Sequence, residues 1–379
     1  MRVLLDVDAI APPLTGIGRY ALALAQGLQK SRRIQKVEFF TVARKFNHLE
    51  DLLQEERTLT KLKRNIPATR VMRKLYHLAG KLQFKSQIKP KNFNLFHSPN
   101  YRLLPFNGNT VSTFHDLSLE RFPEFHPPQR LQIWRNEILP TAARASHIIT
   151  DSEFVRQEVM EFLKVSSDRV TAVPLGVGMA YRDYNERECT EVLARFGLRY
   201  GEFCLVVSTI EPRKNFERLL KAFENLPAEI QKSFPLAIAG AKGWLNNDIH
   251  VAIDRLITRG AAIRLGYVAE TDLPRLYAAA AVMTYPTLYE GFGLPILEAM
   301  ASGTAVLTSN CSSIPEVAGN ACQMVDPYSV EAISAGLQQI LEDNMQREQL
   351  ERAGLMQAKK FTWQKCVDQT IDVYEKLTS

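Results

Sequence analysis

Hydrophobic and polar residues follow two alternating patterns along this chain. Short apolar runs rich in β-branched residues are followed by stretches with helical periodicity, which is typical of parallel-sheet α/β units. A helix is expected over 18–30, and Ser152 has the character of a helix N-cap because an acidic residue follows it in the first turn. The expected strands are 2–8, 37–43, 95–98, 111–114, 148–151 and 170–173 in a first series, and 204–209, 236–239, 263–266, 282–285, 305–309 and 321–325 in a second series.

Two such series predict two doubly wound α/β domains in tandem, facing each other across a cleft. The first domain is expected over 1–183 and the second over 200–360. The join is placed near 181–201, which is charged, turn-prone and weak in hydrophobic periodicity, and the tail, 345–379, is expected to be helical. Ligands of open parallel sheets bind beyond the carboxyl ends of the strands, so functional residues are expected there.

Composition narrows the class of protein. The 379 residues are 46% hydrophobic and 23% charged, which excludes wholesale disorder. No run of 18 or more apolar residues occurs, so no membrane-spanning helix is expected. The five cysteines form no CxxC pair and no zinc-ligand cluster with the seven histidines, which favours a reducing compartment and inert thiols. We therefore expect a soluble, cytoplasmic protein without a metal site.

Positive charge is concentrated in one segment of the chain. The net charge is +6, yet residues 57–91 contain eleven Lys or Arg and no Asp or Glu, which leaves −5 for the rest. One or two basic amphipathic helices there would make a peripheral contact with the anionic inner face of a membrane. The alternative is a solvated basic face that packs on its own domain. Nucleic-acid binding is disfavoured, because the segment has few aromatic residues and no known nucleic-acid motif.

Two short motifs that follow predicted strands suit phosphate binding. Gly16 and Gly18 would let backbone N–H groups approach an anion at a helix N-terminus, although a plain tight turn explains them equally well. Arg213 and Lys214, within Glu-Pro-Arg-Lys-Asn at 211–215, offer a forked donor and a compact cation to a diphosphate. The alternative for this pair is a solvated helix start.

The most specific motif is Leu-Tyr-Glu-Gly-Phe-Gly-Leu-Pro-Ile-Leu-Glu-Ala at 288–299. Gly291 and Gly293 predict a tight loop with exposed backbone donors, and the proline after them suits the first turn of a helix. Glu298 lies about one turn into that helix and could accept both hydroxyls of a ribose. Glu290 precedes the loop and could hold a sugar hydroxyl.

In order and spacing, the motifs of this chain resemble those of glycosyltransferase family 4, whose members are retaining enzymes of the GT-B fold that use nucleotide-activated sugars. The resemblance covers nearly the whole chain, and the most similar branch is that of the bacterial mannosyltransferases of O-antigen and exopolysaccharide assembly. The residues that carry it are Gly16-Ile17-Gly18-Arg19, Phe114-His115-Asp116, Pro174-Leu175-Gly176-Val177, the motif at 211–215, the two glutamates of 290–298, and the segments 301–306 and 314–317.

The resemblance implies roles for individual residues. Arg213 and Lys214 would neutralise the leaving diphosphate. Glu298 would bind the ribose, and Glu290 and His115 would contact the transferred sugar. The remaining donor contacts that it implies are Gly16 and Gly18 near the β-phosphate, the backbone amides of Gly291, Phe292, Gly293 and Leu294, and Tyr267 and Val268 at the nucleobase. It also implies that a C-terminal helix, 361–379, crosses back onto the N-terminal domain.

Two adjacent residues differ from those that many members of this family carry. Ser208 and Thr209 stand at the end of the first strand of the second domain, where many relatives carry Gly-Arg. The diphosphate would then rely more on Arg213 and Lys214.

The activity implied is metal-independent transfer of a hexose with retention, by front-face displacement from a nucleoside-diphosphate sugar. GDP-mannose is favoured over UDP-sugars as the donor, and the acceptor would be a glycan or lipid-linked saccharide in cell-surface polysaccharide biosynthesis. No carboxylate pair of the kind that retaining hydrolases use can be recognised. The alternatives are a sugar-nucleotide epimerase or phosphorylase on the same fold, and a non-catalytic anion-binding module.

Two further groups of polar residues in predicted strands are open to more than one interpretation. Asp6 and Asp8 form a D-x-D pattern inside the first predicted strand, where a structural or sugar-proximal role is favoured over metal binding. His97 ends another predicted strand and is either an acceptor contact or a satisfied structural histidine.

Overall fold

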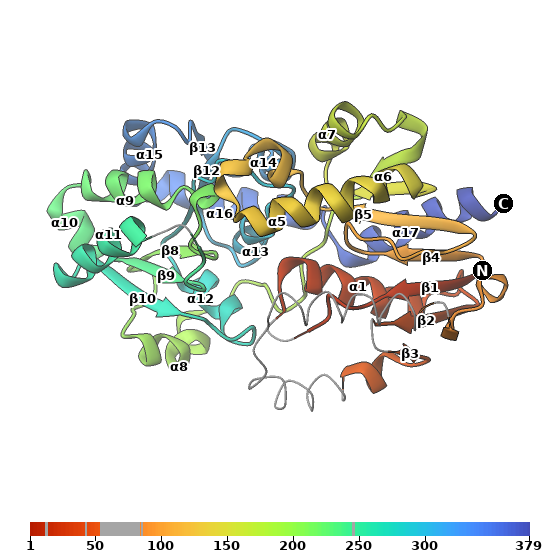
Figure 1. Cartoon of the computed structure of the whole chain (residues 1–379). Coiled ribbons are helices and arrows are strands. Elements are labelled where there is room, and N and C mark those ends of the chain that lie inside the picture. Colours follow the sequence, from red (N-terminus) through yellow and green to blue (C-terminus); the bar gives the residue numbers. More distant parts are fainter. Residues whose placement is uncertain (12–13, 42–43, 54–83, 85, 245–246) are drawn as a thin grey trace. The chain divides into compact units, whose positions relative to one another are not determined.

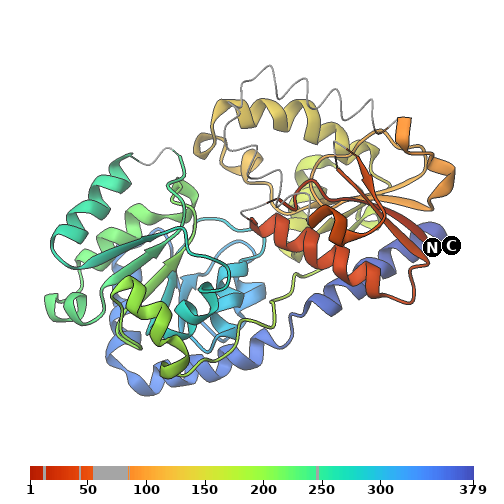
Figure 2. The same ribbon diagram turned by 90° about the horizontal axis from the view of Figure 1, so that it is seen from below.

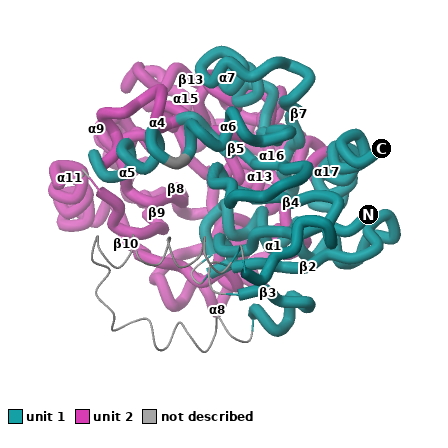
Figure 3. The backbone as a smooth tube through the Cα atoms, turned by 45° about the vertical axis from the view of Figure 1, so that its right-hand side comes forward, with its two compact units in different colours: residues 1–117, 128–176, 363–379 teal, residues 118–127, 177–362 magenta. Residues whose placement is uncertain are grey.

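The computed structural model describes residues 1–11, 14–41, 44–53, 84, 86–244 and 247–379. The chain divides into two compact units, drawn in different colours in Figure 3. Unit 1 comprises residues 1–117, 128–176 and 363–379, and unit 2 comprises residues 118–127 and 177–362. Most of the basic segment 57–91 lies outside the described residues, so its membrane contact stays a prediction. None of the helices in the described ranges is long and apolar enough to cross a membrane.

Unit 1 is built on a seven-stranded sheet in the order β3-β2-β1-β4-β5-β6-β7. The first strand lies inside the sheet, and its residues Val3, Leu4 and Leu5 are fully buried. All neighbouring strands pair in parallel except β2 and β3. The strands are β1 (Arg2–Asp6), β2 (Lys36–Phe40), β3 (Lys45–Phe46), β4 (Leu95–Ser98), β5 (Asn109–Phe114), β6 (His147–Thr150) and β7 (Val170–Ala172).

Two helices from opposite ends of the chain pack side by side in unit 1. The hydroxyl of Thr15 caps α1 (Gly16–Lys30) by accepting from the Gly18 backbone N–H at 3.2 Å. At Gly27 this helix packs closely against α17 (Trp363–Thr378), since an added Cβ would lie 2.4 Å from the Val367 side chain. The two termini consequently lie near each other in this unit (Figure 2). The other described helices of residues 128–176 are α5 (Pro128–Ile133), a π-helical turn (Trp134–Ile138), α6 (Leu139–Arg144), α7 (Glu153–Leu163) and a 3₁₀ turn (Ser167–Arg169).

Unit 2 contains a six-stranded, fully parallel sheet in the order β10-β9-β8-β11-β12-β13. This is the doubly wound order, in which the strand sequence reverses between β8 and β11 and opens a crevice at their carboxyl ends. The strands are β8 (Cys204–Val207), β9 (Leu236–Ala239), β10 (Ala262–Gly266), β11 (Val282–Tyr285), β12 (Val306–Ser309) and β13 (Gln323–Val325).

Helices cover both faces of the unit 2 sheet (Figure 1). Helix α9 contacts both α11 and α15 on one side, and α8, α12, α13 and α16 form a second group. Apolar residues of α9 and α15 join strand residues in one buried core. The helices of this unit are α4 (Ser118–Arg121), α8 (Glu186–Phe196), α9 (Phe216–Glu224), α10 (Ala228–Ser233), α11 (Asn247–Thr258), α12 (Leu273–Ala279), α13 (Leu294–Ala301), α14 (Ile314–Ala318), α15 (Val330–Glu342) and α16 (Asn344–Ala358).

Besides shifts of a few residues in strand bounds, three features of the structure depart from the sequence-based expectations. The predicted join contains α8, which Asn185 and Glu188 start with a capping box and which buries Cys189, Val192 and Leu193. Residues 118–127 belong to unit 2, because Phe122 contacts the ring of Tyr289 and the carbonyl of Phe125 accepts from Trp244. The third difference is β3, a two-residue antiparallel edge strand that was not expected.

Candidate active site

The candidate site of unit 2 lies where β8 and β11 end, at the switch point of its sheet. After β8, the chain makes a short 3₁₀ turn, Pro212–Lys214, and enters α9. After β11, it passes through Pro286 and Thr287 to Glu290 and the glycine loop before α13. Adjacent parallel strands present their carboxyl ends at one edge, so these two loops meet although more than seventy residues separate them.

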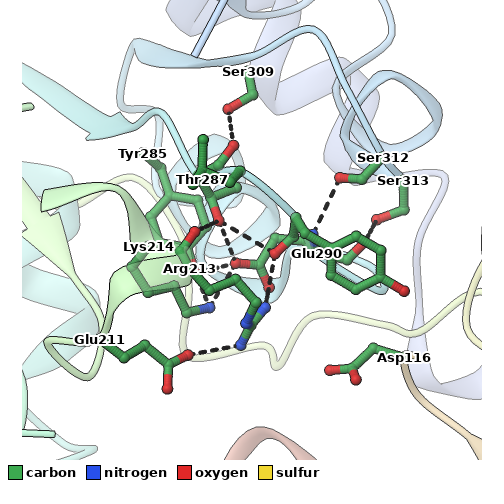
Figure 4. A network of polar contacts seen from close by, with 12 residues as sticks. Asp116, Glu211, Arg213, Lys214, Tyr285, Thr287, Glu290, Ser309, Ser312 and Ser313 are labelled. Atoms are coloured by element: carbon green, nitrogen blue, oxygen red, sulfur yellow. Dashed lines mark hydrogen bonds and ion pairs between the residues drawn. The ribbon is translucent and has the colours of Figure 1, made fainter. Parts of the chain in front are cut away.

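Glu290 is the centre of a buried polar network (Figure 4). Its Oε1 lies 2.6 Å from Lys214 Nζ and accepts hydrogen bonds from Tyr285 at 2.9 Å and Thr287 at 3.0 Å. The Lys214 ammonium also donates to the Tyr285 hydroxyl at 2.6 Å. The side chains of Lys214 and Glu290 are only 11% and 10% exposed, so the solvated helix start considered for this motif is wrong.

Arg213 completes the network from the same turn. Its Nη1 donates to the Tyr289 carbonyl at 2.7 Å and lies 3.3 Å from Glu290 Oε2, while its Nη2 lies 2.8 Å from Glu211 Oε1. Two carboxylates thus face two cations, and the group of four is electrically neutral. The cations are held in place by protein partners, which is the condition for a preorganised electrostatic site.

The charges of this network control its protonation. Burial alone would raise the pKa of Glu290, but Lys214 and Arg213 outweigh it and lower that pKa to about 2. Burial and the charge of Arg213 lower the pKa of Lys214, and Glu290 opposes them. Burial also raises the pKa of Tyr285 well above its usual value, with Glu290 adding to the effect. At neutral pH, Glu290 is therefore a carboxylate and Tyr285 a phenol that can donate its proton.

Asn215 explains why the motif at 211–215 ends in asparagine. It adopts left-handed backbone geometry, with φ of 59°, which asparagine tolerates better than most residues. Its buried side-chain amide donates to the Pro286 carbonyl at 2.8 Å and to the Pro327 carbonyl at 2.7 Å. The residue thereby ties the loop after β8 to the loops after β11 and β13. It was not among the residues predicted for the site.

The loop between the two glutamates leads directly into α13. Gly293 precedes the helix with φ of +108°, which glycine adopts readily, and the proline after Leu294 occupies the first turn. Glu298 lies one turn further and is 3% exposed, with its Oε2 accepting from the Tyr277 hydroxyl of α12 at 3.2 Å. Gly291 and Phe292 are buried within the loop. The two glutamates are thus held by different tyrosines.

Other strand ends of unit 2 carry the remaining predicted residues. Tyr267 follows β10 and is 63% exposed, whereas Val268 beside it is buried. The loop after β9 packs tightly on the loop after β8, since a Cβ at Gly240 would lie 1.8 Å from the Ser208 carbonyl oxygen. Ser208, where this chain differs from many family members, therefore packs against Gly240, which has no room for a side chain.

His115 and Asp151 form a buried pair at the strand ends of unit 1. They follow the neighbouring strands β5 and β6, and His115 Nδ1 lies 2.8 Å from Asp151 Oδ2. The second ring nitrogen, Nε2, lies 3.1 Å from the Pro99 carbonyl. Burial raises the pKa of Asp151, and the charge of His115 opposes that rise. With Asp151 as a carboxylate, both partners of the ring accept hydrogen bonds, so both nitrogens donate and the ring is an imidazolium. Burial lowers the pKa of His115, but Asp151 outweighs it and the net pKa is raised.

A second buried histidine in unit 1 has a different character. His97 Nδ1 lies 2.5 Å from the Tyr374 hydroxyl, and its Nε2 lies 2.9 Å from Thr113 Oγ1. Burial, together with the nearby charge of His115, lowers the pKa of His97 to about 3. It is a neutral, fully satisfied structural histidine, and the acceptor contact considered for it has no free ring nitrogen to use.

The N-terminus of α1 carries Gly16 and Gly18. Gly16 is exposed, whereas Gly18 is buried so tightly that a Cβ there would lie 2.7 Å from the Ala9 carbonyl oxygen. Gly18 is therefore explained by packing. Across the described ranges, no group of three or more His, Cys, Asp or Glu is placed to hold a metal ion.

Comparisons with known proteins agree with this architecture. Residues 14–180 match the family model described as Glycosyltransferase Family 4, and residues 200–357 match Glycosyl transferases group 1. The chain is 36% identical, over 388 aligned residues and 100% of both proteins, to O-antigen chain mannosyltransferase B of Escherichia coli. The chain belongs to glycosyltransferase family 4. The predicted enzyme class and family are confirmed.

Two further matches place this glycosyltransferase among its relatives. It is 33% identical over 293 residues to the serotype-specific mannosyltransferase WbdA of Escherichia coli. That alignment covers 74% of this chain and 36% of the relative. Sucrose-phosphate synthase from Thermosynechococcus elongatus superposes with a TM-score of 0.76 at 19% identity, covering 100% of this chain and 99% of the other. The second match concerns the fold, and with the two Rossmann-like units it confirms the predicted GT-B class.

In this glycosyltransferase the structure brings together Arg213, Lys214 and Glu290, with Glu298 on the helix that follows. Sequence reasoning missed Tyr285, Thr287 and Asn215 as members of the network. Tyr285 sits in an apolar strand pattern that gives no sign of a polar role. Thr287 and Asn215 lie within or beside recognised motifs, and the preference of asparagine for turns was an available signal.

Proposed function

We propose that this glycosyltransferase transfers mannose, with retention of configuration, from GDP-mannose to a glycan or lipid-linked acceptor in cell-surface polysaccharide synthesis. The observation that carries the proposal is the preordered pair of buried cations, Arg213 and Lys214, at the switch point of the unit 2 sheet. The sugar and the pathway are suggested by the mannosyltransferase names of the relatives that are 36% and 33% identical.

The chemistry needs stabilisation of a leaving diphosphate. As the bond from the anomeric carbon to the phosphate oxygen breaks, its electron pair passes to the diphosphate, and negative charge develops there. Arg213 and Lys214 would stabilise that charge, assisted by backbone amides between Gly291 and Leu294. Loss of one preorganised donor of this kind typically costs about 100- to 1000-fold in rate.

Retention would follow from front-face displacement. The acceptor oxygen bonds to the anomeric carbon on the side from which the diphosphate departs, and the departing phosphate oxygen takes the acceptor's proton. The network supports this route, because Glu290 is tied to Lys214 and Arg213 and is poorly placed to act as a free nucleophile. Glu298 would bind the ribose, and Tyr267 and Val268 would contact the base.

Two experiments test the proposal. The first incubates the enzyme with GDP-mannose and an acceptor saccharide and determines the anomeric configuration of the product by NMR. An α product from the α donor is expected, and a β product would overturn the retaining mechanism. The second compares the melting temperature of the protein with GDP-mannose and with UDP-glucose. Stabilisation by the UDP-sugar alone would overturn the choice of donor.

A further inference from the structure

The two carboxylate oxygens of Glu290 have different surroundings. Oε1 receives three donors, from Lys214 at 2.6 Å, Tyr285 at 2.9 Å and Thr287 at 3.0 Å. Among the residues that the structure describes, Oε2 accepts from a single group, Arg213 Nη1, at the longer distance of 3.3 Å. A carboxylate oxygen offers about two lone-pair directions. Oε1 is therefore saturated, whereas Oε2 has room for another donor.

The Tyr285 hydroxyl has a fixed orientation in this arrangement. A lysine ammonium can only donate, so the hydroxyl oxygen must accept from Lys214. The phenolic proton is then directed to Glu290 Oε1, and the raised pKa of Tyr285 keeps that proton in place at neutral pH. Thr287 is less strictly committed, because its one proton also has the Arg213 and Tyr289 carbonyls within 3.3 Å.

We propose that Tyr285 is a positioning residue that anchors Glu290 through Oε1, so that Oε2 is presented to a hydroxyl of the donor hexose. The inference rests on the proposed function, because it concerns the same nucleotide-sugar site. It assigns different tasks to the two oxygens of one carboxylate. Without the Tyr285 hydroxyl, Glu290 keeps its charge and its lysine partner but loses one of the three donors that hold Oε1.

The experiment uses Tyr285→Phe in the full chain, with Tyr200→Phe as a matched control. The Tyr200 hydroxyl donates to the Tyr184 carbonyl at 2.8 Å, so the control also removes one tyrosine hydrogen bond from unit 2, away from the site. The dissociation constants for GDP-mannose and GDP are measured by calorimetry, because their ratio isolates the contribution of the hexose. Turnover is measured in parallel, in the wild type and in Glu290→Gln.

We expect Tyr285→Phe to reduce the preference for GDP-mannose over GDP about tenfold and to lower kcat about tenfold, with GDP affinity changed less than twofold. In the Glu290→Gln background the same substitution should change both quantities less than twofold, because its route of action is already removed. Tyr200→Phe should match the wild type. An unchanged preference in Tyr285→Phe, or an equal loss in both backgrounds, would overturn the inference.

The same measurements separate this inference from the proposed function. A wild type that prefers GDP-mannose to GDP but forms no product overturns the proposed transfer and leaves the positioning role measurable through binding. A wild type without that preference overturns the positioning role. Should Tyr285→Phe prove too unstable to assay, Thr287→Val removes another donor from the same oxygen and is expected to give the same pattern in smaller degree.

Discussion

Lys214 Nζ lies 2.6 Å from Glu290 Oε1, and both side chains are about nine-tenths buried. A buried ion pair that loses one partner leaves an uncompensated charge, which costs about 3–5 kcal/mol. We therefore expect Lys214→Met to lower the free energy of unfolding by about that amount and to reduce kcat by about 100-fold or more. Urea denaturation and steady-state kinetics with GDP-mannose check the two effects.

The helix that follows Lys214 offers a matched control for this prediction. Lys221 of α9 pairs with Glu217 at 2.7 Å, but the two side chains are 58% and 67% exposed. Exposed pairs of this kind contribute less than about 0.5 kcal/mol, so Lys221→Met should leave both stability and kcat close to the wild type. Equal losses in the two variants would mean that removal of a lysine, and not of the buried pair, causes the effect.

The His115 and Asp151 pair predicts a charged imidazole near neutral pH. Asp151→Asn removes the largest opposing charge, so the pKa of His115 should fall, since burial is then opposed only by the Pro99 carbonyl and the charge of Asp116. Ring nitrogen shifts in ¹⁵N NMR distinguish the two states. His147 is the internal reference, because burial lowers its pKa to about 4 and it should stay neutral in both proteins. A neutral His115 in the wild type at pH 7 would contradict the assignment.

Much of the fold could be predicted because buried strands leave a clear pattern. The bounds expected for β4, β9 and β11 agree with the structure, and each of these strands is a run of four buried residues. The edge strand β3 has two residues, one of them exposed, and so leaves no pattern. The helix α8 was missed because its charged surface outweighs its three buried residues.

The candidate site could be predicted only in part, for a related reason. A motif shows that Lys214 and Glu290 each follow a strand, and both were assigned to ligand contacts. That they bind each other depends on the order of β8 and β11 in the sheet, which pairs residues 76 positions apart. Tyr285 is the last residue of a buried strand. It differs from an ordinary core tyrosine only because its hydroxyl contacts Glu290, which the sequence does not show.

Asp6 at the end of β1 predicts a pH-dependent stability. Burial and the charge of Asp8 raise the pKa of Asp6 to about 8. The Ser98 hydroxyl lies 2.6 Å from the Arg102 carbonyl and 3.3 Å from Asp6 Oδ2, and its single proton cannot be donated to both acceptors, so it gives an ionised Asp6 little compensation. The folded state thus holds a proton that the unfolded state releases between about pH 4 and 8, so stability falls as pH rises through this window.

Asp6→Asn tests this directly, since its amide supplies the donor that the protonated carboxyl provides. We expect the variant to equal the wild type in stability near pH 5 and to exceed it by about 4 kcal/mol near pH 8.5, because each pH unit between 5 and 8 costs the wild type about 1.4 kcal/mol. Urea denaturation at both pH values measures the difference. Asp8→Asn should weaken the pH dependence by removing the like charge. A wild type whose stability rises between pH 5 and 8.5 relative to Asp6→Asn would mean that Asp6 is ionised.

Alanine substitutions at Gly240 and Gly260 distinguish the stability cost of backbone strain from that of steric crowding. Both glycines have positive φ, +149° and +70°. A Cβ at Gly240 would lie 1.8 Å from the Ser208 carbonyl oxygen, whereas a Cβ at Gly260 would have no described atom within 4 Å apart from its own chain neighbours. Gly260→Ala should therefore cost only about 1 kcal/mol, the usual penalty for left-handed backbone. Gly240→Ala should cost about 3 kcal/mol or more, because the loop after β9 must move away from β8. Urea denaturation measures both, and equal costs would show that the two loops do not pack as closely as this structure has them.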